Sequence, residues 1–484
     1  MTWQAVGLFE SFRTSGQPGN ITRLLACSEE QLLHYDGLDV GPTFVHHNMR
    51  FGHALIDEVG YPSYNKPASV MFWLEQVDVR EEFIALLDAD MLLRAPLDPV
   101  RLGAARGVVV SAEYSYLVGT DTSNQTHDHA FARRFVDPHE LPLMVRCGGF
   151  HIFHREDIRR IAPLWVEYTR RVRAFARAEP ETYFSESFLN WHQTDVGAGQ
   201  REVYRRQGLW QAEMYGYIFG AARAGVSHVV RRDTMLYPGY SPLGGLLPAI
   251  LHYGADYTLA HEDVPPLQHA TVAATPFTPR LDLEAESTRL ADGWPGGSET
   301  SPTPTPPPPP VYFNKMNQVH LDLYAQLRQP WCQGGTSAFT SAADLAASGS
   351  LAQVFFAQPP PPYRRDGSPR SKRDLLCIEH LQMLNEAFCR FYAARCSNHT
   401  TWTCDSNRAM IQAAMGECVD ADPLCQAHAA SGECTANPVW MYAQCPLACG
   451  ICAAMDEGMQ ALELQRVIGV FDLVGPLAAA PSEP

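Results

Sequence analysis

A short apolar run that ends in two carboxylates constrains the fold of this chain more than any other feature. The run extends from Phe83 to Leu87, and Asp88 and Asp90 follow it directly. Five consecutive apolar residues predict a buried parallel strand, because they are too few for a buried helix. Ligands of open α/β sheets gather at the carboxyl ends of the strands. Two carboxylates at such an end can hold a hard divalent ion, and that ion can carry a diphosphate.

The Asp-x-Asp spacing alone is not specific, because the chain repeats it at Asp420 and Asp422. The second pair lies in a cysteine-rich stretch with no apolar run before it. The context therefore favours Asp88 and Asp90 as a metal site and predicts a structural role for the second pair. An ordinary acidic turn after a strand is the alternative interpretation of the first pair.

Strand and helix patterns alternate along residues 1–265. Apolar periodicity predicts helices at 8–13, 68–76, 158–178 and 212–224, and strands at 21–27, 83–87, 107–112, 150–153 and 228–237. This alternation predicts an α/β fold with a mostly parallel sheet and covering helices. The chain has 484 residues, which leaves room for smaller modules, and its 46% hydrophobic content supports a sizeable core.

Charge and hydropathy argue against two classes of partner. The net charge is −16 at pH 7, which disfavours a surface that binds nucleic acid. No apolar run reaches the ~18 residues that a membrane helix needs, so we expect no transmembrane segment in this chain.

The thirteen cysteines are unevenly spread. Only Cys27 and Cys147 precede residue 330, and eleven cysteines lie between Cys332 and Cys452. Dense cysteines in a short segment indicate disulfides and an oxidising compartment, so we expect the secretory pathway, in the Golgi or ER lumen. Met1 is not followed by the basic and then apolar pattern of a signal peptide, so we also expect a longer natural N-terminus.

The C-terminal half is expected to have three parts. Residues 266–373 read as a Pro-rich linker and irregular segment, with polyproline II over 294–310. Residues 374–404 predict a cysteine-containing helical extension. Residues 418–452 are too few to fold on an apolar core alone and need covalent links. Their six cysteines are Cys418, Cys425, Cys434, Cys445, Cys449 and Cys452. Disulfides are favoured over a zinc site at the last three, and the pairing stays open.

Several ordered blocks make the chain similar to a known family. They are residues 16–27, 65–67, 83–96, 213–222, 237–240 and 252–254. Together they resemble the peptidyl serine α-galactosyltransferases of plants and algae, with the hydroxyproline O-arabinosyltransferases as more distant relatives. The resemblance covers residues 1–256 and returns at 374–396. It implies a GT-A-type, Rossmann-like fold, a UDP-sugar donor and Mn²⁺ or Mg²⁺.

The resemblance implies a metal site at Asp88, Asp90 and His252. Asp88 would bind the metal or the ribose of the donor. His252 follows the apolar run 249–251, which can end at the same sheet edge, and imidazole binds Mn²⁺ well enough beside carboxylates. A capping or core histidine is the alternative interpretation.

Four further residues are candidates for substrate binding. Arg23, Asn65 and Lys66 could bind the nucleotide or diphosphate through charge-assisted hydrogen bonds, with surface solvation as the alternative. Glu213 opens a predicted helix, where the helix dipole favours a carboxylate in any protein. The family implies that this residue faces the acceptor. The family also has a basic residue after the position of His252 that holds the diphosphate, and no residue of this chain can be assigned to it.

Residues 418–452 resemble a ShKT domain through Gly432 to Cys434, Asn437 with Pro438, and Met441. That family implies the disulfide pairs Cys418–Cys452, Cys425–Cys445 and Cys434–Cys449.

The resemblances imply a reaction. We expect an Mn-dependent transfer of galactose, with retention, from UDP-galactose to serine hydroxyls of hydroxyproline-rich, extensin-like proteins. A hydroxyproline O-arabinosyltransferase is the alternative enzyme. The relatives also carry a strand ahead of the position of Trp3 that this chain lacks, so an inactive lectin-like or scaffold protein is a third alternative.

Overall fold

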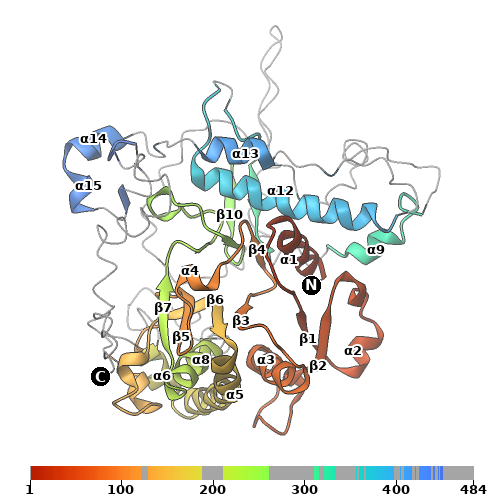
Figure 1. The fold of residues 1–484 in the computed structure, drawn as a ribbon, viewed down its shortest axis with the longest axis vertical. Helices are drawn as coiled ribbons and strands as arrows, with labels where there is room; N and C mark the ends of the chain where they lie inside the picture. The colour runs from red at the N-terminus through yellow and green to blue at the C-terminus, as the bar shows by residue number, and fades with distance from the viewer. Residues whose placement is uncertain are drawn as a thin grey trace, which may run out of the picture.

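The structure is a computed structural model. It describes residues 2–120, 129–187, 211–260, 310–315 and 321–333, and shorter stretches between 356 and 450. Figure 1 shows the helices α3, α5 and α8 together at one end of the molecule and α12 with α13 at the other. The strands lie between these two groups of helices. The described residues therefore form a mixed α/β protein, as the alternation of patterns predicts.

The largest sheet has four strands in the order β3-β6-β5-β7. These strands are β3 (Phe83–Leu86), β6 (Cys147–His154), β5 (Val108–Glu113) and β7 (Ser227–Arg231). β6 runs antiparallel to both of its neighbours, and only β5 and β7 are parallel. The expectation of a mostly parallel sheet is therefore wrong for the described residues. A parallel pair needs a crossover helix, and among the described residues the chain passes from β5 to β6 through 3₁₀ turns alone.

Three smaller sheets surround it. β1 (Arg23–Cys27) pairs in parallel with β2 (Thr43–His47). A three-stranded sheet has the order β4-β9-β8, from β4 (Met91–Leu93), β9 (Ile250–His252) and β8 (Met235–Leu236). β10 (Tyr257–Leu259) pairs antiparallel with β11 (Val311–Phe313). The strand predicted over 228–237 is thus divided between β7 and β8, which belong to different sheets.

Two helices pack unusually closely against each other on one side of the four-stranded sheet. α5 (Arg155–Ala178) buries a stripe that includes Ile158, Ile161 and Trp165 at helical spacing. α8 (Ala212–Arg223) meets this stripe through Gly216, where an added Cβ would lie 2.6 Å from the backbone nitrogen of Thr169. α3 (Asn65–Gln76) covers the same side beside them (Figure 1).

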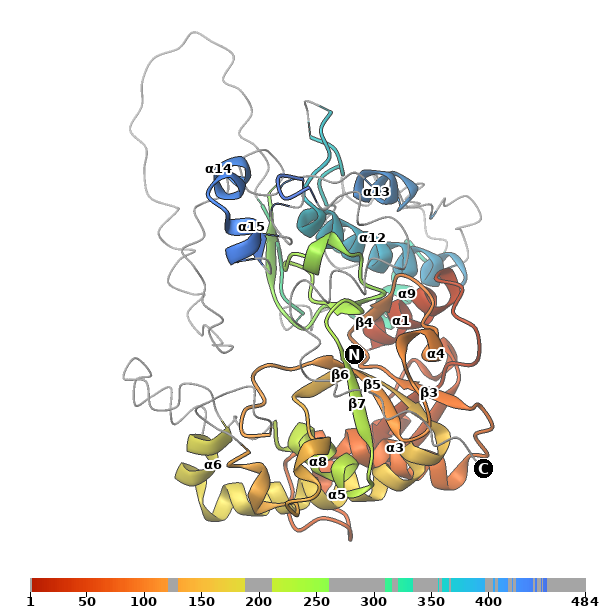
Figure 2. The ribbon, with the colours of Figure 1, turned by 60° about the vertical axis from the view of Figure 1, so that its left-hand side comes forward.

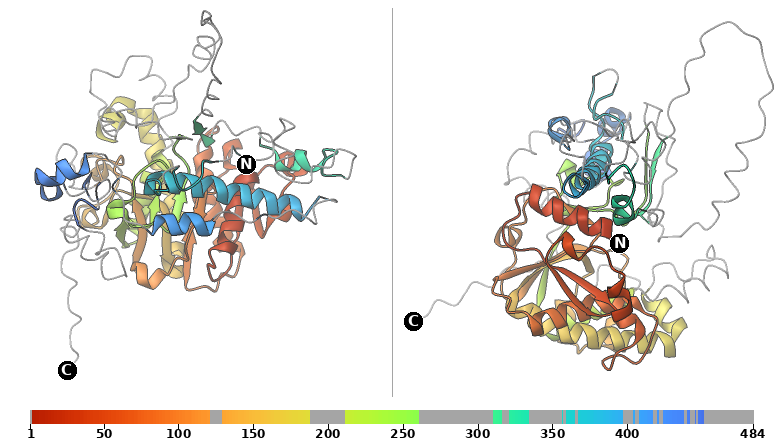
Figure 3. Two further views of the ribbon diagram at one scale, coloured as in Figure 1. Left: turned by 90° about the horizontal axis from the view of Figure 1, so that it is seen from above. Right: turned by 90° about the vertical axis from the view of Figure 1, so that its right-hand side faces the viewer.

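A second apolar core forms between the N-terminal helix and a helix from the C-terminal half of the sequence. α12 (Lys372–Ala393) packs along α1 (Thr2–Thr14), as the views in Figures 1 and 3 show. An added Cβ at Gly7 would lie 2.6 Å from Cδ2 of Leu384. The indole of Trp3 stacks on Tyr253 with ring centroids 5.8 Å apart. Residues 374–393, expected as a helical extension, therefore belong to the core that supports β4 and β9.

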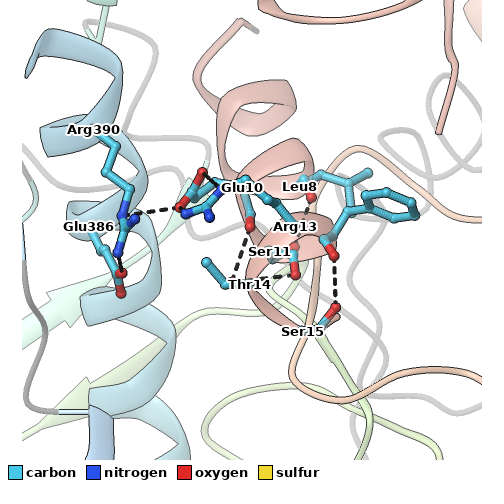
Figure 4. A network of polar contacts seen from close by, with 9 residues as sticks. Leu8, Glu10, Ser11, Arg13, Thr14, Ser15, Glu386 and Arg390 are labelled. Carbon is cyan, nitrogen blue, oxygen red and sulfur yellow. Dashed lines mark hydrogen bonds and ion pairs between the residues drawn. The ribbon is translucent and has the colours of Figure 1, made fainter. Parts of the chain in front are cut away.

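Polar contacts reinforce the packing of α1 on α12. The Nε atom of Arg390 lies 3.1 Å from the Glu10 carboxylate, and its Nη2 lies 2.5 Å from Glu386 (Figure 4). Arg13 shares the Glu10 carboxylate from the next turn of α1. Surface pairs of this kind contribute little individually, so the apolar contacts carry most of the stability of this interface.

Four disulfides occur among the described residues. Two lie before the ShKT-like region, in the cysteine-dense part where disulfides were expected without a stated pairing. Cys332–Cys396 joins the segment after α9 (Leu323–Leu327) to the residues just after α12, and Cys389–Cys404 joins α12 to a residue beyond its end. The other two, Cys425–Cys445 and Cys434–Cys449, are pairs that the ShKT resemblance implies. They attach α14 (Cys425–Ala430) to Cys445 and α15 (Glu433–Ala436) to Cys449. Both helices lie in the same half of the molecule as α12 (Figure 2).

Several expectations fall outside the described residues. These are the third ShKT pair, Cys418 with Cys452, the polyproline segment 294–309, and Asp422. Asp420 is described, and its Oδ1 accepts hydrogen bonds from the backbone N–H groups of Leu447 and Ala448. This capping function agrees with the structural role expected for that aspartate. None of the described helices is both long and apolar enough to cross a membrane.

Candidate metal centre

The turn between β3 and β4 carries both carboxylates of the first Asp-x-Asp pair. β3 ends at Leu86, and the N–H of Met91 donates to the carbonyl oxygen of Asp88 at 3.1 Å, which closes the turn. Asp90 immediately precedes β4. The turn thus connects the four-stranded sheet to the three-stranded sheet, at the carboxyl end of β3, where the sequence predicts a ligand site.

β9 brings His252 to the same place. In the antiparallel pairing of β4 with β9, His252 lies opposite Met91. The N–H of Tyr253 donates to the carbonyl oxygen of Asp90 at 3.0 Å. Backbone pairing therefore determines the position of the histidine relative to Asp90, although 162 residues of sequence separate them.

The three side chains form a compact group of possible metal ligands. One ligand atom from each of Asp88, Asp90 and His252 lies within 4.8 Å of the other two. Asp90 and His252 are only 7% and 6% exposed. The His252 ring stacks on Tyr237, with centroids 4.6 Å apart, and its Nδ1 is buried with no hydrogen-bond partner among the residues that the structure describes. Two carboxylates and one imidazole suit Mn²⁺, so the donor set fits such an ion.

Two lysines neutralise the two carboxylates in this structure. The ammonium of Lys66 lies 2.7 Å from Oδ1 of Asp88, and that of Lys315 contacts Oδ2 of Asp90. Burial by itself raises the pKa of Asp90, but His252 and Lys315 together hold the pKa well below its usual range. Burial would likewise lower the pKa of Lys66, but the nearby Asp88 and Glu213 carboxylates raise it above its ordinary value. The site therefore combines an ionised Asp90 carboxylate with cations that can bind an anionic group.

Sequence reasoning missed Lys315. This residue follows β11 in the part of the chain expected to be an irregular linker, and the pairing of β11 with β10 brings it to the site. The structure differs from the linker expectation here because Val311 and Phe313 are buried in the second core. The alternation of Val311 and Phe313 with an exposed Tyr312 was the available signal for a strand. Nothing in the local sequence indicates that this strand ends beside Asp90.

Asn65 and Lys66 are the first two residues of α3, but their side chains contact different partners. The ammonium of Lys66 reaches Asp88, whereas the amide of Asn65 is occupied elsewhere. Its Oδ1 accepts from the N–H of Met49 at 2.8 Å, and its Nδ2 donates to Oδ1 of Asn48 at 3.0 Å. Asn65 therefore holds the 3₁₀ turn η2 (Met49–Phe51) against the start of α3.

The structure does not bring Arg23 into this group. Arg23 opens β1, so it lies at the opposite end of that strand from its carboxyl edge. Its guanidinium donates to the carbonyl oxygen of Gly37 at 2.7 Å and to the Thr43 hydroxyl at 2.8 Å. It also lies over the ring of Tyr35. These contacts give Arg23 a role in holding the loop between β1 and β2.

Glu213 lies in the first turn of α8 and is 5% exposed. Its backbone N–H donates to the Tyr61 hydroxyl at 3.2 Å, and its carbonyl oxygen accepts from the indole of Trp165 at 2.9 Å. Burial raises the pKa of the Glu213 carboxyl to about 7, with Lys66 opposing the shift and Asp88 adding to it. The structure therefore brings Glu213 within electrostatic range of Lys66 and Asp88.

Asp137, His139 and Glu140 form a second group with metal-ligand spacing among the described residues. The guanidinium of Arg223 lies 3.0 Å from Asp137 and 2.9 Å from Glu140. This cation accounts for the cluster, which shows no further sign of a ligand.

Two families match parts of the chain. Residues 9–192 match the hydroxyproline O-arabinosyltransferase family N-terminal domain, and residues 417–452 match the ShK domain-like family. The chain is 39% identical over 259 residues to a peptidyl serine alpha-galactosyltransferase of Arabidopsis thaliana, which covers 54% of this chain and 29% of the relative. It is 27% identical over 497 residues to the enzyme of that name from Chlamydomonas reinhardtii, which covers 94% of this chain and 54% of the relative. The chain is therefore similar to the peptidyl serine alpha-galactosyltransferases.

A more distant similarity extends to the arabinosyltransferases. The hydroxyproline O-arabinosyltransferase PLENTY of Lotus japonicus is 27% identical over 249 residues, which covers 50% of this chain and 57% of the relative. The chain thus spans little more than half the length of these relatives, and less of the Arabidopsis protein. All three relatives are glycosyltransferases by name. The matched domain at 9–192 contains Lys66, Asp88 and Asp90 but ends before His252 and Lys315.

Proposed function

We propose that this chain contains a metal-dependent glycosyltransferase domain of GT-A type that transfers galactose from UDP-galactose to serine hydroxyls of hydroxyproline-rich proteins. The observation that carries the proposal is the group formed by Asp88, Asp90 and His252 together with Lys66 and Lys315. It combines a divalent-ion donor set with two ammonium groups at a strand end. The names of the relatives support the galactosyl group and the serine acceptor. We infer retention of configuration from the same similarity.

In this proposal Asp88, Asp90 and His252 hold Mn²⁺ or Mg²⁺. The bound ion would act as a Lewis acid for the diphosphate and neutralise charge on the departing UDP. Nε2 of His252 lies 3.4 Å from Oδ1 of Asp90, and an added Cβ at Gly254 would lie 3.3 Å from the same nitrogen; both observations support this assignment. Any side chain at position 254 would crowd the imidazole.

Lys66 and Lys315 are assigned to the diphosphate. Each ammonium is paired with one of the candidate metal ligands, so an ion bound to the carboxylates would displace both cations from their partners. Phosphate oxygens are then the natural acceptors for two desolvated ammonium groups. Lys315 therefore supplies the basic residue that could not be assigned from the sequence.

Glu213 is assigned to the acceptor side of the site. A carboxyl whose pKa is about 7 exchanges its proton readily near neutral pH, which suits a group that handles the proton of an acceptor hydroxyl. Trp165 and Tyr61 hold its backbone in place. A secretory location, in the Golgi or ER lumen, completes the proposal and is supported by the disulfides among the described residues.

A hydroxyproline O-arabinosyltransferase is the second candidate, because the family match at 9–192 carries that name. Donor hydrolysis separates the two candidates. The chain, incubated with Mn²⁺ and either UDP-galactose or UDP-arabinofuranose, should release UDP faster from the galactose donor. Faster release from the pentose donor would favour the arabinosyltransferase. An absence of UDP binding in titration calorimetry with Mn²⁺ would favour an inactive lectin-like or scaffold protein.

A further inference from the structure

Four tyrosines form a continuous row from the start of α8 to the candidate metal centre. The rings of Tyr116 and Tyr114 lie 5.0 Å apart. The Tyr237 hydroxyl donates to the Tyr114 hydroxyl at 3.1 Å, and the rings of Tyr237 and Tyr240 lie 6.2 Å apart. We call these four residues the tyrosine row.

The two ends of the tyrosine row coincide with the two sides of the proposed reaction. At one end the Tyr116 hydroxyl donates to the sulfur of Met214 at 3.4 Å, next to Glu213 in the chain. Near the other end Tyr237 stacks on His252, one of the candidate metal ligands. The row therefore connects the surroundings of the acceptor carboxyl with those of the metal ligands.

Packing of the fold accounts for only part of the row. Tyr114 is 3% exposed, and its ring occupies the space over Gly148, where an added Cβ would lie 2.1 Å from its Cδ2. Tyr116 and Tyr237 are half-buried. Tyr240 is 60% exposed, so no packing requirement of the fold explains a tyrosine at that position. The row thus starts in the core and ends with aromatic surface open to solvent.

The backbone presents the exposed end in a defined conformation. The N–H of Tyr240 donates to the carbonyl oxygen of Tyr237 at 3.1 Å, which closes a four-residue turn. Pro238 and Gly239, whose φ is 97°, occupy the centre of this turn, as a type II turn requires. The guanidinium of Arg373 on α12 donates to the carbonyl oxygen of Gly239 at 2.7 Å. The two rings are therefore held by a supported turn and need no large rearrangement on binding.

We propose that the solvent-facing end of the tyrosine row, formed by Tyr237 and Tyr240, is the subsite for the acceptor polypeptide, and that it binds a proline-rich segment in the polyproline II conformation. Aromatic-lined surfaces bind polyproline II segments because these ligands are ordered in advance and present flat pyrrolidine rings. The inference rests on the proposed function, which supplies a hydroxyproline-rich acceptor. It adds the residues that bind this acceptor and the conformation in which it is bound.

The test measures binding of a labelled peptide, Ser followed by four prolines and flanking residues, by fluorescence anisotropy without any donor. Tyr240→Ala should weaken binding roughly three- to tenfold, since aromatic stacking contributes on this scale. Tyr240→Phe should bind as the wild type does, because the ring makes the contact. Phe51→Ala is the matched control, since Phe51 is an exposed aromatic residue, 55% exposed, on η2. Replacing the prolines of the peptide by alanines should abolish the difference between wild type and Tyr240→Ala.

Donor hydrolysis keeps the two proposals separable. Peptide binding is measured without donor, and hydrolysis of UDP-galactose by the wild type with Mn²⁺ is measured without peptide, so each proposal has its own readout. Equal binding of the proline-rich peptide by wild type and Tyr240→Ala would overturn the subsite, whatever the donor assay shows. Peptide binding that depends on Tyr240 without any donor hydrolysis would support the subsite and contradict the glycosyltransferase proposal.

Discussion

The ammonium of Lys315 contacts the Asp90 carboxylate across 225 residues of sequence. The pairing of β11 with β10 brings the lysine there, and the turn between β3 and β4 provides the aspartate. In this contact the ammonium of Lys315 is bound to a carboxylate oxygen of Asp90 that the metal proposal needs as a ligand. A metal ion that bound to Asp90 would therefore displace Lys315 from this carboxylate.

Removing Lys315 should strengthen metal binding while weakening donor use. In Lys315→Ala the ammonium no longer competes for Asp90, so the Mn²⁺ affinity should rise by a factor of about 5 to 30. The KM for UDP-galactose should rise because one cation for the diphosphate is lost. Calorimetric titration with Mn²⁺ alone measures the first effect and does not depend on activity. A weaker Mn²⁺ affinity in this variant would contradict the assignment of Asp90 as a metal ligand.

Asp90→Asn should abolish metal-dependent turnover. The variant loses the charge that pairs with His252 and Lys315 and that would bind the ion. We expect the Mn²⁺-dependent rate to fall on the order of 100-fold or more. Asp420→Asn is the control, because it keeps the Oδ1 oxygen that caps Leu447 and Ala448. Full Mn²⁺-dependent turnover in Asp90→Asn would exclude the proposed site.

Glu213 should make the folded protein less stable as the pH rises toward neutrality. Burial raises the pKa of this carboxyl from 4.5 to about 7 in the folded state. Its contribution is therefore fully present below pH 4.5 and is lost as the pH rises through 7, by roughly 3 kcal/mol in total. Glu213→Gln removes the titrating group, so the difference in unfolding free energy between variant and wild type should change across pH 4.5 to 7. Urea unfolding at several pH values measures this difference, and a difference independent of pH would contradict the raised pKa of Glu213.

The contact between α8 and α5 should tolerate no side chain at Gly216. An added Cβ there would lie 2.6 Å from the backbone of Thr169, which cannot move aside without displacing α5. Gly216→Ala should lower the free energy of unfolding by about 1 to 3 kcal/mol. Gly220→Ala is the matched comparison, since its Cβ would lie 3.0 Å from the backbone nitrogen of Trp165. This substitution should therefore lower the free energy of unfolding by less. If both variants were equally stable, close approach of the two helices would not be the reason for these glycines.

The sequence determined the local elements of this protein and one half of its candidate site. The apolar run at 83–87 appears as β3 with the two carboxylates in the turn after it, because strand ends are encoded within a few residues. The prediction of a buried parallel strand is wrong, since β3 is a partly exposed edge strand that runs antiparallel to β6. The helices at 158–178 and 212–224 are also encoded locally, through apolar spacing that persists over several turns.

Only the tertiary structure decided which distant residues complete the site. Strand direction, the approach of Lys315, and the diversion of Arg23 and Asn65 to loop contacts depend on pairings between segments far apart in the chain. Such pairings leave no short-range pattern, because they are selected by the packing of whole elements and by the entropy of closing long loops. The helix at 372–393 illustrates the same limit: its apolar stripe predicts a helix, and only the packing of α1 against it shows that it belongs to the core beneath the metal centre.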